Sequence, residues 1–367
     1  MLSKHMKKVL FALFAITLLS ACSNEEHGEY YPDISTRELH YITRSGERVE
    51  FSDDSFDAAI ISNTYENGKG VVRFATPLRS IGLLGAPDIT SITIPTTVKN
   101  FDGNPFKYCA NLVRFISTYA TSDGYALVCD GTLIAFARNY RSEKYEIPYG
   151  VKAIGKSAFY FAPLKEIAIP NSVVKIGDTA FYGCGKLEEL VFPERLEELG
   201  REVCVDCVNL KSVTVPRNVA ISEDFAGFVG CYSLESFNGE NISADGRCLV
   251  VDKRLYAFAP ANLQEYSIPE DIVALTDRSF AMCDELTKVT IPSSVVLLGS
   301  GVFYKCTKLS EIYLQPETPP TIKQSVDGSK LFEGLPADYS LYVSSSSYAK
   351  YTSNTDWAYY MSHIRKK

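Results

Sequence analysis

A period of about 23 residues constrains this chain more than any other feature of its sequence. A proline that follows an apolar residue returns at regular intervals. These prolines are Pro148, Pro170, Pro193, Pro216, Pro269 and Pro292, with spacings of 22, 23 and 23 residues and, after a gap, 23 residues. A unit of this length cannot bury its apolar side alone, so the period predicts an array of stacked repeats.

The same apolar positions return in each unit. In the unit that follows Pro170 they are Val173, Ile176, Gly177, Phe181, Cys184, Leu187, Leu190 and Phe192, and the units after Pro95, Pro269 and Pro292 keep this phase. Leu190 and Phe192 alternate with Val191, which predicts a short strand that Pro193 ends. Equivalent strands about 4.8 Å apart would form a parallel sheet over a thin, continuous core. The sequence therefore predicts a solenoid.

Residues 172–184, Ser-Val-Val-Lys-Ile-Gly-Asp-Thr-Ala-Phe-Tyr-Gly-Cys, resemble the BspA-like leucine-rich repeats of bacterial surface proteins. The resemblance covers residues 71–314, and the period lies within the range of leucine-rich repeats. It implies a right-handed α/β repeat solenoid closed by a terminal strand and helix. Three departures look local: Cys204 replaces the phenylalanine, Ala162 replaces the cysteine, and an extra residue precedes Phe228.

A longer repeat overlies the short one. Residues 123–137 parallel residues 245–259 at an offset of 122, and each copy holds two apolar runs around a turn, which predicts a hairpin that pairs with the array. The expected domains are an N-terminal β cap at 39–75, the solenoid at 76–315 with hairpin insertions at 118–147 and 239–268, and a C-terminal cap at 316–367.

Both caps are expected to protect exposed core and strand edges. In the first cap, residues 58–63 and 71–74 resemble strands around the turn at 68–70. In the second, residues 341–343 predict a strand. A helix is predicted from the spacing of Trp357, Tyr360, Met361 and Ile364.

The first 21 residues have the form of a secretion signal. Lys4, Lys7 and Lys8 precede an apolar run at 9–19 that is too short to span a bilayer. The run ends in Leu-Ser-Ala-Cys22, which resembles the lipobox of bacterial lipoproteins and implies that Cys22 carries the lipid. Residues 22–38 would form an acidic tether, and residues 23–26 resemble the surface-export signal of Bacteroides-type lipoproteins.

The charge of the chain excludes one class of partner. Removal of residues 1–21 takes three lysines and no acidic residue from a formal net charge of −7, which leaves −10. Nucleic-acid binding needs clustered Lys and Arg, so it is not expected. No second apolar stretch reaches spanning length, so the lipid is the only expected membrane attachment.

The cysteines follow the repeat, which argues against metal or redox chemistry. Cys204 and Cys207 form a CxxC pair, but Cys207 shares its phase with five other cysteines. These are Cys109, Cys184, Cys231, Cys283 and Cys306. Stacked neighbours would lie too far apart for a disulfide, so we expect small, buried free thiols and no metal or cofactor. Whether Cys129 and Cys248 pair is left open.

The inventory of catalytic side chains is poor. After signal removal only His27, His40 and His363 remain, and none lies in the repeats, which argues against a histidine-based catalytic centre there. Acidic residues that could form a glycosidase pair are expected on outward strand positions as ordinary solvated side chains. They are Glu166, Glu188, Glu189 and Glu311. We therefore expect a protein that is not an enzyme.

The outward side chains of the strands form the candidate binding face. Its selected members are Arg114, Glu166, Glu189, Thr214, Lys288, Thr290, Glu311 and Tyr313. Such a face suits extended contact with a protein or polymer. The family resemblance implies an outer-membrane lipoprotein on the cell surface that adheres to host or bacterial surface proteins. The alternative is an accessory glycan-binding protein of an outer-membrane nutrient-uptake system, for which aromatic platforms would be expected.

Overall fold

The computed structural model describes residues 35–325, 328 and 330–367, which form one compact unit. Its elements are short strands joined by hydrogen-bonded turns, and the predicted lipidation site and signal segment lie outside the described residues. None of the helices in the described part has the length and apolar character that crossing a membrane requires.

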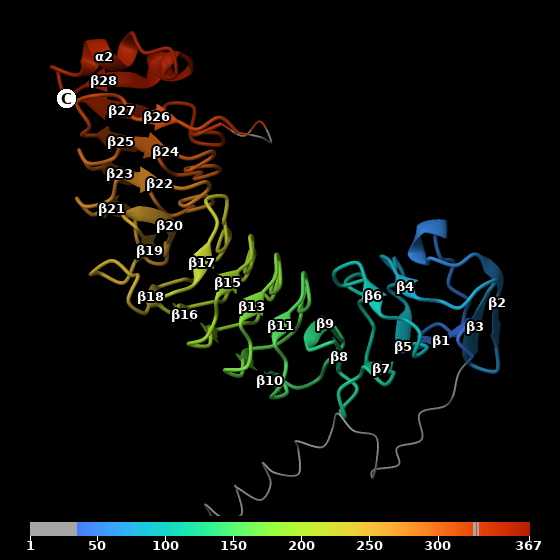
Figure 1. The fold of residues 1–367 in the computed structure, drawn as a ribbon. Coiled ribbons are helices and arrows are strands. Elements are labelled where there is room, and N and C mark those ends of the chain that lie inside the picture. Colours follow the sequence, from blue (N-terminus) through green and yellow to red (C-terminus); the bar gives the residue numbers. More distant parts are fainter. Residues whose placement is uncertain (1–34, 326–327, 329) are drawn as a thin grey trace, which may run out of the picture. The chain divides into compact units, whose positions relative to one another are not determined.

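Each turn of the array carries two short strands that belong to two different sheets (Figure 1). The long strand, such as β12 (Glu166–Ala168), ends near the proline, and a two-residue strand such as β13 (Lys175–Ile176) follows it. Lys175 lies opposite Glu198 and Ile176 opposite Leu199 in parallel pairing, so the register equals the sequence period. The predicted solenoid is confirmed, with strands rather than helices as its building elements.

The array consists of three blocks, each of which opens with antiparallel strands and continues in parallel ones. Block I spans residues 38–116. Its strands are β1 (Glu38–Thr43), β2 (Ile60–Glu66), β3 (Lys69–Phe74), β4 (Ser80–Ile81), β5 (Ile89–Thr93), β6 (Asn100–Phe101) and β7 (Arg114–Ile116), with the 3-10 helix η1 (Asp53–Ser55). β2 and β3 pair across a turn at Asn67 and Gly68, so the two predicted cap strands are confirmed. The turn is shorter than the predicted 68–70, because Lys69 and Gly70 pair with Glu66 and Tyr65 as part of β3.

Block II spans residues 126–238. Its long strands are β10 (Lys144–Glu146), β12, β14 (Glu189–Val191), β16 (Ser212–Thr214) and β18 (Ser236–Asn238). Its other strands are the hairpin of β8 (Ala126–Cys129) and β9 (Thr132–Phe136), followed by β11 (Ala153–Ile154), β13, β15 (Glu198–Leu199) and β17 (Ala220–Ile221).

Block III spans residues 248–366. Its long strands are β21 (Glu265–Ser267), β23 (Lys288–Ile291), β25 (Glu311–Leu314), β27 (Ser340–Val343) and β28 (Ile364–Lys366). Its other strands are the hairpin of β19 (Cys248–Val251) and β20 (Arg254–Phe258), followed by β22 (Ala274–Leu275), β24 (Leu297–Leu298) and β26 (Thr321–Ile322).

The two hairpins are walls shared by neighbouring blocks. Both pair with the array as predicted, β9 with β11 and β20 with β22. Side chains of a strand alternate between its two faces, and a register shift within each hairpin changes the phase of that alternation, so each hairpin contributes to two core clusters. Leu133 and Phe136 belong to the cluster of block II, whereas Leu127 and Ala135 belong to that of block I. The second hairpin divides its side chains between blocks II and III in the same way.

Phenylalanines stack along the core. The ring centroids of Phe136 and Phe159 lie 5.1 Å apart, and those of Phe159 and Phe181 lie 5.5 Å apart. In block III the column runs from Phe258 through Phe280 and Phe303, with centroid separations of 4.6 and 5.4 Å. The hairpins thus supply the first ring of each column.

The cysteine column lies beside the phenylalanines. The Sγ atoms of Cys184 and Cys207 donate to the carbonyls of Phe159 and Phe181, each 3.1 Å away. All nine cysteines in the described part are buried free thiols, including Cys129 and Cys248. The prediction of free, structural thiols is confirmed.

The C-terminal cap departs from its prediction at one end. After the short helix α2 (Tyr348–Thr352) comes the 3-10 helix η2 (Ala358–His363), but Ile364 belongs to β28. The predicted helix through Ile364 is therefore wrong there, because the backbone of Ile364 pairs with Leu341 and extends the parallel sheet. Trp357 is fully buried in this cap and donates from Nε1 to the carbonyl of Pro320, 2.9 Å away.

Candidate functional site

The predicted binding face divides among several sheets. Arg114 lies on β7, Glu166 on β12, Glu189 on β14 and Thr214 on β16. Glu166 forms an ion pair with Lys144 one turn earlier, at 2.6 Å. These side chains are exposed or half-buried.

The other four predicted residues meet in block III. Lys288 lies opposite Glu311, and Thr290 lies opposite Tyr313, on the paired strands β23 and β25. The hydroxyl of Tyr313 donates to a carboxylate oxygen of Glu311 at 3.0 Å, and Nζ of Lys288 lies 5.7 Å from the ring centroid of Tyr313. Lys288 also pairs with Glu265 at 2.9 Å.

Two residues that the sequence analysis missed complete this surface. Tyr342 on β27 stacks on Tyr313 with centroids 4.8 Å apart and planes 19° apart, and Nζ of Lys367 lies 5.1 Å from the Tyr313 centroid. Alternation along the predicted strand at 341–343 already placed Tyr342 outward, so that signal was present. We call Lys288, Glu311, Tyr313 and Tyr342 the tyrosine face.

The electrostatics of the tyrosine face favour a neutral phenol. The hydrogen bond to Glu311 raises the pKa of Tyr313, because a carboxylate that accepts from the hydroxyl stabilises its protonated form. The hydrogen bond to Glu265 raises the pKa of Lys288, so its ammonium remains charged. The face therefore offers flat rings beside charges of both signs.

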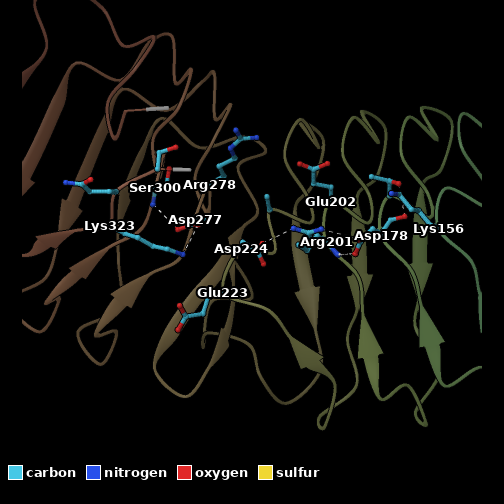
Figure 2. A pocket seen from close by; sticks show the side chains of 14 residues that line it. Lys156, Asp178, Arg201, Glu202, Glu223, Asp224, Asp277, Arg278, Ser300 and Lys323 are labelled. Carbon is cyan, nitrogen blue, oxygen red and sulfur yellow. Dashed lines mark hydrogen bonds and ion pairs between the residues drawn. The ribbon is translucent and has the colours of Figure 1, made fainter. Parts of the chain in front are cut away.

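A charged groove lies beside the short strands of the array, whereas the tyrosine face lies on the long strands (Figure 2). It has a volume of about 530 Å³ and is lined by residues of blocks II and III. Charged members from block II are Lys156, Asp178, Arg201, Glu202, Glu223 and Asp224, and those from block III are Asp277, Arg278 and Lys323. The candidate face did not include them.

A repeated position places these charges. Lys156, Asp178 and Arg201 each follow the glycine that ends a two-residue strand, so they form a column with one residue per turn. Arg201 contacts Asp178 at 3.3 Å and Asp224 at 3.0 Å. Asp178 also accepts from the backbone N–H of Arg201 at 2.8 Å. The alternation of positive and negative charge at the repeat spacing was visible in the sequence.

The charges of the groove largely satisfy one another. Burial raises the pKa of Asp224, but hydrogen bonds from Ser222 and Arg201 outweigh it and hold that pKa below its usual value. Lys323 pairs with Asp277 at 3.0 Å. Exposed pairs of this kind contribute roughly 0–1 kcal/mol each. The groove is therefore a polar surface built of neutralised charges.

Neither surface holds a metal centre or a reactive thiol. No group of three or more His, Cys, Asp or Glu residues that could hold a metal occurs in the part of the chain that the structure describes. Cys204 and Cys207 are fully buried, and burial raises the pKa of Cys204 well above its usual value. A thiol in this state is a poor nucleophile and a poor ligand.

Comparison with known proteins gives one family match. Six copies of the BspA type leucine rich repeat region match residues 83–123, 134–245 and 254–328. A comparison with curated proteins gives no match at the threshold used.

Several solved structures are similar at low identity. A leucine-rich repeat protein from Bacteroides ovatus is 22% identical over 84% of this chain and 80% of its own, with a TM-score of 0.45. A leucine rich cell surface protein from Faecalibacterium prausnitzii is 18% identical over 87% of this chain and 92% of its own, with a TM-score of 0.40. A leucine-rich repeat protein from Eubacterium ventriosum is 21% identical over 67% of this chain, with a TM-score of 0.38. The match covers 59% of that protein's own length.

Proposed function

Because the chain belongs to the BspA-type leucine-rich-repeat family, whose members are typically surface or adhesion-type scaffolds, we propose that it is a cell-surface lipoprotein that binds a protein partner. Repeats supply a scaffold, and the binding function belongs to the side chains that the scaffold presents. The proposed role is adhesion to a host or bacterial surface protein without catalysis.

The tyrosine face is the observation that carries this proposal. Tyr313 and Tyr342 present a stacked pair on two hydrogen-bonded strands, with Lys288, Glu311 and Lys367 around them. Tyrosines are frequent energetic centres of protein interfaces, and surrounding charges give an interface its specificity. A parallel sheet holds these side chains at fixed separations, which limits the entropy lost on binding.

The proposed attachment rests on Cys22. A diacylated Cys22 would hold the mature chain at the membrane, since two or more acyl chains are needed for stable anchoring. The proposed arrangement is signal peptide 1–21, tether 22–38 and solenoid beyond, in the outer membrane with the solenoid outside the cell. β1 begins at Glu38, so the folded region follows the tether directly.

Substitution of Cys22 tests the attachment. Cells that express the natural chain or Cys22→Ser are grown with an alkyne-bearing palmitate, and label on the protein is measured. We expect label on the natural chain alone. Protease added to intact cells should then degrade the natural chain, whereas resistance in intact cells with digestion after lysis would exclude the surface location.

Binding to extracellular-matrix proteins tests the partner. The full chain in mild detergent is measured against immobilised fibronectin, laminin and collagen. We expect Tyr313→Ala combined with Tyr342→Ala to weaken binding about tenfold or more, as loss of an interface centre does. Tyr149→Ala is the control, since Tyr149 is 87% exposed and lies outside the tyrosine face. Equal binding by all three chains would contradict the proposed site.

A further inference from the structure

Four aromatic side chains form a strip that the proposed function does not use. They are Tyr108, Tyr160, Phe161 and Tyr182, which occupy turns before and after the first hairpin. Tyr160 stacks on Tyr182 with centroids 5.4 Å apart, and Tyr108 meets Tyr160 edge-on at 6.0 Å. Phe161 lies 4.8 Å from Tyr160. We call these four residues the aromatic ridge.

Two of the four residues of the ridge are exposed to solvent. Tyr108 is 44% exposed and Phe161 is 43% exposed, which places both among the exposed large hydrophobic residues of the described part. Contiguous exposed aromatic surface on a folded protein marks an interaction site more often than isolated apolar residues do.

The turn that holds Phe161 has a backbone conformation that the repeat shares. Phe161 has φ of +53°, in the left-handed region that favours glycine. The equivalent position of later turns has the same backbone, with φ of +68° at Gly183, +59° at Asp206, +76° at Gly230, +60° at Met282 and +55° at Lys305, so the left-handed conformation belongs to the repeat turn. The Phe161 ring lies against Gly183, where an added Cβ would come within 2.6 Å of the ring. The absence of a side chain at Gly183 therefore leaves room for the Phe161 ring on the surface.

Two cations accompany the ridge. Nζ of Lys107 lies 5.2 Å from the centroid of Tyr108 and 5.7 Å from that of Tyr160. The guanidinium of Arg138 lies 5.2 Å from the centroid of Phe161 and donates to the carbonyl of Lys107 at 3.0 Å. Within the described residues neither cation has a carboxylate in ion-pair contact, unlike Arg201 or Lys288. At the Tyr182 end of the ridge, burial and then the charge of Asp206 raise the pKa of Tyr182, so a carboxylate lies there. The part of the ridge beside Lys107 and Arg138 therefore complements anionic groups of a ligand.

The ridge differs from the tyrosine face in its cations, because Lys107 and Arg138 have no ion pair within the described residues whereas Lys288 pairs with Glu265, and this difference favours an acidic sugar polymer. The charged groove, and a second hollow of about 540 Å³ beside Asp252 and Asp271, are lined by residues outside the ridge. Rings and hydroxyls presented turn after turn on an open surface suit the apolar C–H face and hydroxyl edge of successive sugar rings.

We propose that the aromatic ridge binds an acidic polysaccharide, with sugar rings against Tyr108 and Phe161 and sugar carboxylates or sulfates at Lys107 and Arg138. This site is separate from the tyrosine face and does not depend on it. Its ligand class is a uronate-bearing or sulfated glycan.

Affinity electrophoresis of the full chain in mild detergent tests the site. Gels contain polygalacturonate, alginate, hyaluronate or heparin, with dextran as the neutral polymer. We expect retardation by at least one acidic polymer, none by dextran, and weaker retardation as salt rises. Retardation by polygalacturonate, alginate or hyaluronate would show that carboxylates are sufficient, whereas retardation by heparin alone would show that sulfates are required. Lack of retardation by all four would overturn the proposal.

Variants assign any binding to the ridge. We expect Phe161→Gly to weaken binding about tenfold, since ring and cation contacts are lost, and its fold should persist because glycine accepts the same φ. A thermal melt checks the fold. Lys107→Gln combined with Arg138→Gln should remove the preference for acidic polymers over dextran.

Matched controls separate the ridge from other surfaces. Tyr304→Ala combined with Lys305→Gln removes a similar ring and cation, 5.1 Å apart, from a later turn and should leave binding unchanged. Tyr313→Ala combined with Tyr342→Ala should also leave glycan binding unchanged. Retardation that survives Phe161→Gly would overturn the site, and loss of fibronectin rather than glycan binding in Phe161→Gly would identify a protein ligand instead.

Discussion

At the residue scale, the buried thiols show how one side chain serves the whole array. Each ladder cysteine fills a small space in the core, and several donate to the carbonyl of the aromatic residue one turn earlier. Burial raises the pKa of Cys109 and of Cys248 to about 12. Both thiols therefore remain neutral in the folded chain at any physiological pH.

These thiols make the fold sensitive to alkali. Above their usual pKa of 9.0 the unfolded chain loses protons that the folded chain retains, so the contribution of these thiols to the free energy of unfolding should be constant below pH 9 and fall between pH 9 and about 12. Each thiol would contribute a slope of about 1.4 kcal/mol per pH unit in this range. Urea unfolding at successive pH values measures the slope, and Cys109→Ala should reduce it. An unchanged slope in that variant would contradict the assignment.

Individual residues also show what the sequence could and could not predict. Alternation along strands was sufficient to place Lys288 and Tyr313 outward. Their contact with Lys367 depends on the end of the cap, and the charged groove depends on turns from two blocks lying near one another. The aromatic ridge joins residues 52 positions apart, Tyr108 and Tyr160, because the hairpin intervenes between their turns. Local patterns carry no information on such distances.

At the element scale, the hairpins are more than insertions. The sequence predicted both of them and their pairing with the array, from apolar runs around a turn. Their division between two cores does not follow from alternation alone, because Leu133 and Ala135 lie in different cores although they are two residues apart on β9, and the register shift after Leu127 accounts for the change of phase. The end of η2 could not be predicted, because the tertiary pairing of Ile364 overrides its helical spacing.

Truncation on the two faces of one hairpin should loosen different blocks. Leu249→Ala and Leu255→Ala each remove a fully buried side chain, and each should lower the free energy of unfolding by about 2–5 kcal/mol. Leu249 belongs to the core of block II and Leu255 to that of block III. Hydrogen exchange should show lost protection in the corresponding block. Val191→Ala, at a half-exposed position, is the control, and identical exchange patterns for both variants would contradict the shared wall.

At the scale of the whole molecule, stability should be distributed along the array. In a repeat protein each turn contacts chiefly its neighbours, so distant blocks are weakly coupled. The family match confirms the repeat type that the sequence indicated, across most of the span expected. The single tryptophan, Trp357, lies buried in the last cap and reports on block III alone.

In block I variants, the unfolding midpoint followed by Trp357 fluorescence should therefore differ from the midpoint followed by circular dichroism. Phe106→Ala removes a buried ring from the first core and should shift the circular-dichroism transition in urea, since such changes cost about 3–5 kcal/mol. The fluorescence midpoint should hardly move. Phe303→Ala in block III is the control and should shift both signals. A shift of both midpoints in Phe106→Ala would show that the array unfolds as one cooperative unit.

The shared walls have a consequence for how such chains can change in length. Both hairpins have the same pattern at an offset of 122 residues, and each closes the block before it while opening the block after it. A duplication or deletion of one whole module, from one hairpin to the next, would join compatible surfaces. The array could then be lengthened or shortened in steps of 122 residues without leaving an uncovered edge.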